Sequence, residues 1–269
     1  MTTPMLAWDM TPVASSQDQS GLLVLLPSLG TTTVLWDKTV AGLRAAHLPT
    51  RILRIDLPGH GASPVARSSF SMSDLATATL GVIDRVGGGT FCVAGDSMGG
   101  CVSLELALLA PERVRGLAMF CSGSRIGTPD TWTARAELVR RYGTAALIQS
   151  SPARWFSPRF LDGPGGGRGR QTLQELALVD AESYALCAEA LSTFDRSADL
   201  SLVRTPSLIV AGADDSVTSP GEMLALANAL PIADFCELPN TAHLAPLEQP
   251  TATARLLGEL VGVGNLVYG

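Results

Sequence analysis

The stretch Val93–Gly100, VAGDSMGG, marks the point where a short apolar run ends and a helical pattern begins. The run before the turn, Phe91–Ala94, is wholly apolar, as in a buried strand, and the residues from Ser103 have the apolar spacing of a helix. Glycines on both sides of Ser97 suit a tight turn, because a residue without a side chain tolerates strained backbone and close neighbours. The stretch therefore predicts a strand, a sharp turn and a helix in direct succession.

The same alternation of short apolar runs and longer helical patterns extends along most of the chain. Apolar runs that predict strands begin near positions 22, 51, 90, 116, 207 and 233. Helical patterns are expected across Ser103–Ala110 and from about Trp36, Ser73, Pro220 and Pro246. This alternation is typical of an α/β protein with a mostly parallel central sheet and helices on both faces. In the first 20 residues the pattern is poor and leaves room for one or two antiparallel edge strands.

Between Gly123 and Thr205 the alternation stops. Helical patterns there are separated by a glycine-rich stretch, and they cover residues 132–143, 144–151 and 171–194. The separating stretch, Gly163–Arg170 (GPGGGRGR), predicts a mobile surface loop; it follows no strand and lacks the G-K-[ST] ending of a phosphate cradle. Ligands bind at the carboxyl ends of the strands in an open parallel sheet. We therefore expect residues 124–204 to form a helical cap over that edge, between core segments 1–123 and 205–269.

Composition favours a small-molecule partner. The 269-residue chain is 46% hydrophobic and 16% charged, enough to bury a sizeable core, and its formal net charge is −6. An acidic surface does not attract nucleic acid or an anionic membrane. The sequence contains no apolar run long enough to span a membrane, and its N-terminal stretch has neither the basic nor the apolar part of a signal peptide. A cytoplasmic location is therefore expected. The oligomeric state is left open.

The cysteines are predicted to be small apolar core residues. They are odd in number, scattered, and include no C-x-x-C pair, which argues against a disulfide framework or a zinc site. The set comprises Cys92, Cys101, Cys121, Cys187 and Cys236.

Ser97 is the candidate nucleophile. It occupies the centre of a G-x-S-x-G pattern whose setting, between a strand and a helix, is that of a nucleophile elbow. Such a turn strains the serine backbone and exposes its hydroxyl at the sheet edge, above the helix N-terminus. The alternative is a serine that merely caps the helix.

A serine hydroxyl needs a base and an acid that orients the base. His243, in the loop before the last helix, is the candidate base; His60, in DLPGHGAS, is expected to make structural hydrogen bonds, and His47 to be exposed near a helix end. The acid should follow a strand, and both Asp214 and Asp215 follow SLIVAGA. Serine, acid and histidine then occur in the chain order typical of one class of hydrolases.

Longer stretches carry a family resemblance. They are PSLGTTTVLWD, DLPGHGAS, GDSMGG, APERVRGLAMFCSG, SRIGTPDTW, ARWFSPRF, SYALCAEALSTFD and AHLAPLEQP. With these the chain resembles the α/β-hydrolases and, within them, the 3-oxoadipate enol-lactonases of aromatic catabolism. The resemblance spans nearly all of residues 25–250 and implies an α/β-hydrolase fold with a helical cap.

The resemblance also implies residue roles. Ser97 would attack, His243 would accept its proton, and Asp215 would orient the histidine, with Asp214 as the competing acid. The backbone N–H groups of Leu29 and Met98 would stabilise the oxyanion. The expected reaction opens a small lactone through an acyl-enzyme and requires neither a metal nor an organic cofactor.

An enol-lactone with a free carboxylate calls for a cationic anchor in the cap. Arg135 lies one helical turn after Trp132, so a guanidinium that binds the carboxylate and an indole that covers the ring share one face. Arg125, Arg140, Arg141 and Arg154 are further arginines of this segment, and most are expected to be solvated.

Two departures from the family pattern concern the substrate. Pro27 replaces the usual asparagine and has no N–H, and Asp96 places a carboxyl directly before the nucleophile. The alternatives are a carboxylesterase, a carbon–carbon bond hydrolase, and a lyase, isomerase or ligand-binding protein that retains the fold.

Overall fold

A computed structural model describes residues 3–11 and 21–266. In this part of the chain one sheet has the strand order β1-β3-β2-β4-β5-β6-β7. All neighbouring strands are parallel except β1, which pairs antiparallel with β3. The strands are β1 (Trp8–Thr11), β2 (Gly21–Leu26), β3 (Thr50–Ile55), β4 (Phe91–Asp96), β5 (Val114–Phe120), β6 (Ser207–Gly212) and β7 (Ala233–Leu238). The predicted α/β fold is confirmed, and β1 is one of the predicted edge strands; residues 12–20 lie outside the description.

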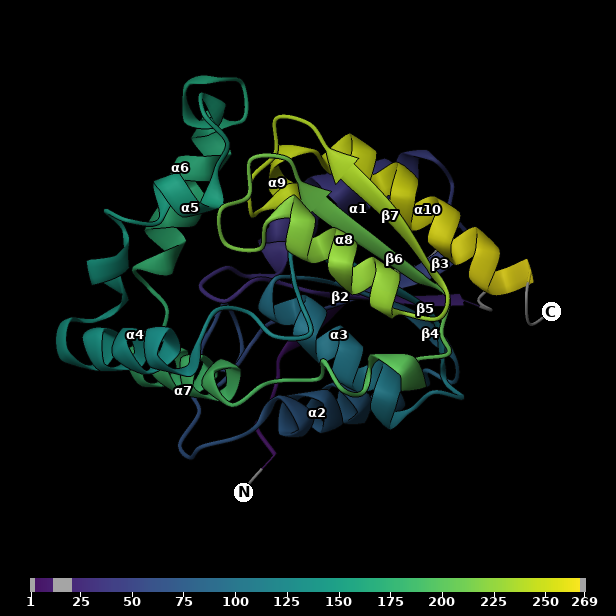
Figure 1. The fold of residues 1–269 in the computed structure, drawn as a ribbon, viewed down its shortest axis with the longest axis horizontal. Helices are drawn as coiled ribbons and strands as arrows, with labels where there is room; N and C mark the ends of the chain where they lie inside the picture. The colour runs from purple at the N-terminus through teal and green to yellow at the C-terminus, as the bar shows by residue number, and fades with distance from the viewer. Residues whose placement is uncertain (1–2, 12–20, 267–269) are drawn as a thin grey trace.

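Helices cover both faces of the sheet (Figure 1). On one face α1 and α10 pack together, and α2, α3 and α8 cover the other. Their bounds are α1 (Asp37–Ala45), α2 (Met72–Arg85), α3 (Met98–Leu109), α8 (Pro220–Ala229) and α10 (Pro250–Leu266), with the short α9 (Ala245–Glu248) before the last. The wholly buried β4 lies at the centre of the sheet, which explains its continuous apolar run.

Local sequence explains several helix starts. Ser71 and Asp74 form a capping box at the start of α2, and Ser219 and Glu222 form another at the start of α8. Pro220 occupies the first turn of α8, where its missing N–H costs nothing.

Within the described residues no helix has the length and apolar character to cross a membrane.

The chain between β5 and β6 is helical and lies at the end of the molecule toward which the parallel strands run (Figure 1). Its helices are α4 (Pro129–Tyr142), α5 (Pro152–Trp155), α6 (Gly166–Leu176) and α7 (Ala181–Ser192). The same segment contains the short 3-10 turns η2 (Thr144–Leu147), η3 (Phe160–Asp162) and η4 (Leu200–Leu202), whereas η1 (Thr33–Trp36) precedes α1. Helices α4 and α7 pack side by side, and Arg140 of α4 forms ion pairs with Glu182 and Glu189 of α7. We refer to residues 124–204 as the cap.

Three sequence-based boundaries in this region and at the C-terminus were wrong. The glycine-rich stretch is not all loop, because α6 begins at Gly166, where a side chain would collide with the Leu161 carbonyl. The helical pattern over residues 171–194 belongs to two helices, since Asp180 caps a new helix by accepting a hydrogen bond from the Ser183 N–H. The last long helix starts at Pro250 rather than near residue 246, where the separate turn α9 intervenes.

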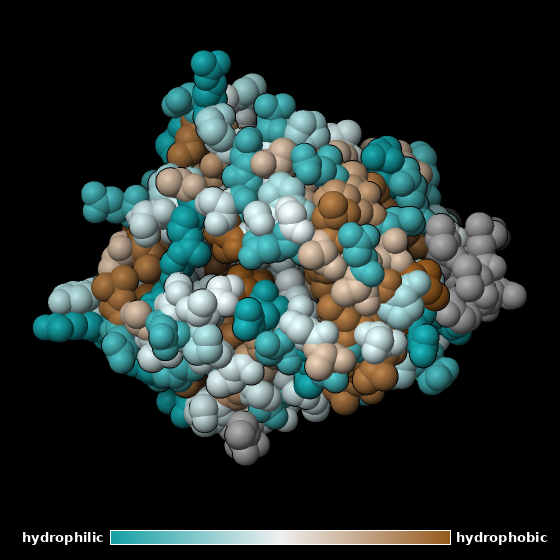
Figure 2. All heavy atoms as spheres, in the orientation of Figure 1, coloured by the Kyte–Doolittle hydropathy of each residue, from teal (hydrophilic) through white to brown (hydrophobic). Residues whose placement is uncertain are grey.

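The surface is mostly polar, with apolar side chains gathered over α8 and the nearby β7 edge of the sheet (Figure 2). The exposed Leu224 of α8 and Ile232, just before β7, belong to this region. Four of the cysteines are buried and Cys236 is partly buried, all as free thiols, which agrees with the predicted core role.

Candidate active site

Ser97 sits on a strained turn between β4 and α3. Its φ of 53° lies in the left-handed region, which non-glycine residues rarely adopt. The turn is possible because side chains are absent around it: a Cβ at Gly95 would lie 2.0 Å from the Gly99 carbonyl carbon, and one at Gly99 would lie 2.4 Å from the Leu26 carbonyl oxygen. The glycines that flank Ser97 in the sequence are thus required by close backbone approach.

A chain of hydrogen bonds connects Ser97 to a histidine and a carboxylate. Ser97 Oγ lies 2.8 Å from His243 Nε2, and His243 Nδ1 lies 2.8 Å from Asp215 Oδ2. All three residues are buried, although they come from the ends of three different segments of the chain. This arrangement allows the histidine to accept the serine proton while the carboxylate stabilises the resulting imidazolium.

Asp215, rather than Asp214, faces the histidine. Asp215 Oδ1 accepts backbone N–H groups from Val217 at 2.7 Å and Thr218 at 3.2 Å, and the Thr218 hydroxyl donates to Oδ2 at 2.8 Å. Burial opposes ionisation of this carboxyl, but His243 and these donors hold its pKa below the usual range. Asp214 is exposed, and its N–H donates to the Thr241 carbonyl.

The two predicted oxyanion donors belong to the loop after β2 and to the start of α3. Met98 is the first residue of α3, so its N–H belongs to the first turn, which has no partner within the helix. In the described part of the chain the Leu29 N–H donates to no group. Pro27, directly after β2, has no N–H, but the Leu29 N–H is unaffected.

His60 anchors the loop that carries Leu29. Its Nε2 accepts the Gly30 N–H at 3.0 Å, so Nδ1 carries the proton and donates to the Pro58 carbonyl at 2.8 Å. Complete burial lowers the pKa of His60 to about 4, which keeps the ring neutral and able to accept. These contacts agree with the predicted structural role. His47 is exposed just after α1.

Arg135 of α4 lies close to two aromatic residues of the cap. Its guanidinium carbon lies 5.5 Å from the centroid of the Trp132 ring, whose Nε1 donates to the Ile126 carbonyl at 2.6 Å. Burial raises the pKa of Tyr184, an effect that nearby Arg135 opposes. Tyr184 in turn lies against Gly30, next to the oxyanion loop. Within the described residues Arg135 forms no ion pair, whereas Arg125 and Arg140 do.

Several site residues were not identified from the sequence. The Ser122 hydroxyl donates to the Ser97 carbonyl at 2.7 Å, and Trp155 and Tyr184 both approach Gly30. Glu248 bonds the histidine loop to the cap, as described below. All four residues lie in stretches that carry the family resemblance, and this was the available signal. Their contacts join distant parts of the chain, which no local pattern indicates.

Asp96, the last residue of β4, immediately precedes Ser97 in the chain and is completely buried. The Ser28 hydroxyl donates to its Oδ2, while Oδ1 has no hydrogen-bond partner among the described residues. Burial raises the pKa of Asp96 well above the usual range; the Ser28 bond opposes the shift, and Asp215 and Glu248 add to it. Burial therefore favours the neutral form of this carboxyl.

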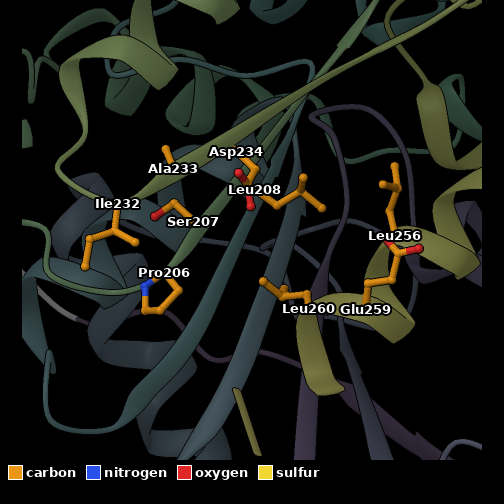
Figure 3. A pocket seen from close by; sticks show the side chains of 9 residues that line it. All are labelled: Pro206, Ser207, Leu208, Ile232, Ala233, Asp234, Leu256, Glu259 and Leu260. Carbon is orange, nitrogen blue, oxygen red and sulfur yellow. The ribbon is translucent and has the colours of Figure 1, made fainter. Parts of the chain in front are cut away.

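A separate pocket of about 270 Å³ lies at the end of the sheet where β6 and β7 begin, and Figure 3 shows the side chains that line it. Ser207 and Ala233, the first residues of β6 and β7, line it together with Leu256 and Leu260 of α10. Ser97 is instead at the carboxyl end of β4. The pocket thus has no part in the chemistry of the hydrogen-bonded serine.

Comparison with known proteins places the chain in a family. The alpha/beta hydrolase family matches residues 23–256, which is most of the sequence. The protein belongs to the alpha/beta hydrolase family, and the predicted class of enzyme, a hydrolase, is confirmed.

Its relatives include proteins of several activities. The 3-oxoadipate enol-lactonase 2 of Acinetobacter baylyi is 32% identical over 233 residues, covering 86% of this chain and 84% of that protein. A putative carbamate hydrolase of Pseudomonas savastanoi is 29% identical and covers 88% of this chain and 92% of its own length. The crystal structure of the enol-lactonase from Burkholderia xenovorans has a TM-score of 0.89 at 26% identity, with 96% of both chains covered.

Proposed function

We propose that the protein is a serine hydrolase that opens a small anionic lactone, 3-oxoadipate enol-lactone being the first candidate, through an acyl-enzyme on Ser97. The hydrogen-bonded series from Ser97 through His243 to Asp215 supports the hydrolase chemistry. The similarity to two named enol-lactonases, one in sequence and one in structure, supports the lactone.

The proposed reaction has two stages. The Ser97 hydroxyl adds to the lactone carbonyl as His243 accepts its proton, and the Leu29 and Met98 N–H groups stabilise the oxyanion. When the tetrahedral intermediate collapses, the ring C–O bond breaks and the leaving enol oxygen takes the proton from His243, which gives an acyl-enzyme and a neutral histidine. Water then gives a proton to His243 as it attacks the ester carbonyl. The bond from the acyl carbon to Ser97 Oγ breaks, His243 returns the proton to Ser97, and the open diacid is released.

Arg135 is the proposed anchor for the substrate carboxylate. Within the described residues Arg135 has no carboxylate partner. It interacts with Tyr184, and Tyr184 lies against Gly30, so the proposed anchor is connected by contacts to the loop that carries Leu29. Trp132 stacks beneath the guanidinium and restricts its motion. A planar guanidinium can then bind the carboxylate through two parallel hydrogen bonds.

The test is disappearance of the enol-lactone, followed by its ultraviolet absorbance, for the wild type and Ser97→Ala beside a simple aryl ester and an alkyl carbamate. Rapid loss of the lactone that depends on Ser97 supports the proposal. Turnover of ester or carbamate alone would retain the hydrolase but overturn the lactone as substrate. Turnover that persists without Ser97 would overturn the proposed mechanism.

A further inference from the structure

Two buried side chains connect the segments that carry the oxyanion donors. Ser28 lies immediately before Leu29, and Asp96 lies immediately before Ser97 and Met98. The Ser28 hydroxyl donates to Asp96 Oδ2 across 68 residues of sequence, and neither residue is more than 1% exposed. This single bond therefore spans the gap between the two halves of the proposed oxyanion hole.

We propose that Asp96 is a positioning residue, which holds Ser28 so that the Leu29 and Met98 N–H groups converge on the reacting carbonyl oxygen. The inference rests on the proposed function, because it assumes that these N–H groups stabilise an oxyanion. It assigns a role to a buried carboxyl that the proton transfer between Ser97 and His243 does not use.

The local backbone explains how the position of Ser28 reaches Leu29. The Ser28 carbonyl accepts both the N–H and the hydroxyl of Thr31, at 3.0 and 2.9 Å, and so closes a tight turn around Leu29. On the far side of the turn, His60 holds the Gly30 N–H. Asp96 thus holds Ser28, and His60 holds Gly30. The N–H of Leu29, which lies between these two residues in the chain, takes its position from both.

Other contacts hold the same loop but leave this role to Asp96. Asp56 accepts the Thr33 N–H at 2.7 Å, beyond the turn. Among the described residues, no other hydrogen bond between side chains connects the loop of Ser28 with the turn at Ser97. Loss of the Asp96 carboxyl therefore frees the two donors to shift relative to one another while each segment keeps its own fold.

The charge of Asp96 matters as well as its bond. Facing groups are Ser28 from the loop after β2, Cys121 at the end of β5, Asp215 after β6 and Glu248 of α9, and none of them is cationic. A neutral carboxyl can hold Ser28 without opposing an oxyanion. An ionised one would place negative charge beside the oxygen that becomes negative in the transition state, which would slow the reaction.

The experiment compares steady-state kinetics with an aryl ester for the wild type, Asp96→Leu, Asp96→Asn and Ser28→Ala. We expect Asp96→Leu and Ser28→Ala to lower kcat roughly 10- to 100-fold with KM within about twofold, since donors that are misplaced lose transition-state rather than ground-state binding. Asn keeps a carbonyl acceptor for Ser28, so Asp96→Asn should recover kcat to within about threefold at neutral pH.

A pH profile and a double variant separate positioning from mere structural support. Because burial raises the pKa of Asp96, the wild type should lose kcat where this carboxyl ionises, above its usual range, and Asp96→Asn should not show this loss. Because Ser28 and Asp96 share one bond, Ser28→Ala combined with Asp96→Leu should cost about as much as either change alone. Ser207→Ala, which removes a buried hydroxyl at the other end of the sheet, is the matched control and should leave kcat unchanged.

Each outcome has a distinct meaning. If Asp96→Leu lowers thermal stability but leaves kcat as in Ser207→Ala, the positioning role is overturned. The same holds if only KM rises, or if Asp96→Asn is as slow as Asp96→Leu. If Asp96→Leu does not fold, Ser28→Ala decides the question. Persistent turnover in Ser97→Ala would instead overturn the proposed function itself.

Discussion

Glu248 accepts two hydrogen bonds from Ser157, at 2.9 Å from the backbone N–H and 2.5 Å from the hydroxyl. Its other oxygen accepts the Ala242 N–H at 2.7 Å, next to His243. One carboxylate therefore joins the cap to the loop that presents the histidine. The Leu244 N–H adds a second connection by donating to the Trp155 carbonyl at 3.2 Å.

Replacing Glu248 by alanine should loosen both segments. The change removes three hydrogen bonds and leaves two backbone N–H groups without their partner, so we expect a loss of about 2–4 kcal/mol in the free energy of unfolding. Ser157→Ala removes only the hydroxyl bond and should cost about 1 kcal/mol. Urea denaturation measures both, and equal losses in the two variants would contradict this role for Glu248.

The two adjacent aspartates offer a matched pair. Asp215→Asn should lower kcat roughly 10³- to 10⁴-fold, because an amide at this position favours the wrong histidine tautomer. Asp214→Asn alters an exposed side chain of similar size and should change kcat less than about twofold, in line with other surface substitutions. Aryl ester hydrolysis is the measurement. Comparable losses in both variants would show that the acid has been misassigned.

His60 should make stability depend on pH. Its pKa is about 4 in the folded protein and about 6.5 when unfolded, so between these values the unfolded chain binds a proton that the folded chain does not. The contribution is complete above pH 6.5 and is lost as the pH falls to 4, up to roughly 3 kcal/mol.

Thermal unfolding between pH 4 and 7 tests this expectation. His60→Gln keeps an acceptor for the Gly30 N–H but cannot titrate, and its melting temperature should fall less steeply with acid than that of the wild type. Parallel curves for the two proteins would mean that His60 does not contribute to acid sensitivity.

Arg135 should act on binding of anionic substrates. Arg135→Ala is expected to raise KM for an anionic lactone or ester roughly 10- to 100-fold, the loss typical of a charged hydrogen bond, and to leave a neutral ester almost unaffected. Arg141→Ala, an exposed arginine one and a half turns further along α4, is the control. An unchanged KM for the anionic substrate in Arg135→Ala would sink the assignment.

The sequence predicted the fold well because its strongest signals are local. The apolar run of β4, the glycines around Ser97 and the strand-end position of Asp215 each follow from nearby residues. Their meeting with His243 was also expected, since parallel strands end at one edge of a sheet. The catalytic roles themselves stay predictions.

What the sequence did not reveal depends on distant packing. The start of α6 at Gly166 could not be predicted, because a run of glycines favours a loop. The Leu161 carbonyl, which leaves no room for a side chain at Gly166, approaches it only in the folded chain. Ser28, the partner of Asp96, lies 68 residues away, and Ser157, one partner of Glu248, lies 91 residues away; no local pattern encodes such pairs. The same burial that hides these partners also shifts the pKa values of both carboxyls upward.

The central claim is that Ser97 is the nucleophile of a hydrolase, and peptide mass mapping after rapid acid quench tests it most directly. During turnover of an activated aryl ester, the wild type should carry the acyl mass on the peptide that contains Ser97. Ser97→Ala should carry none and should lose turnover. An acyl group on another residue, or hydrolysis by Ser97→Ala at the wild-type rate, would contradict the account.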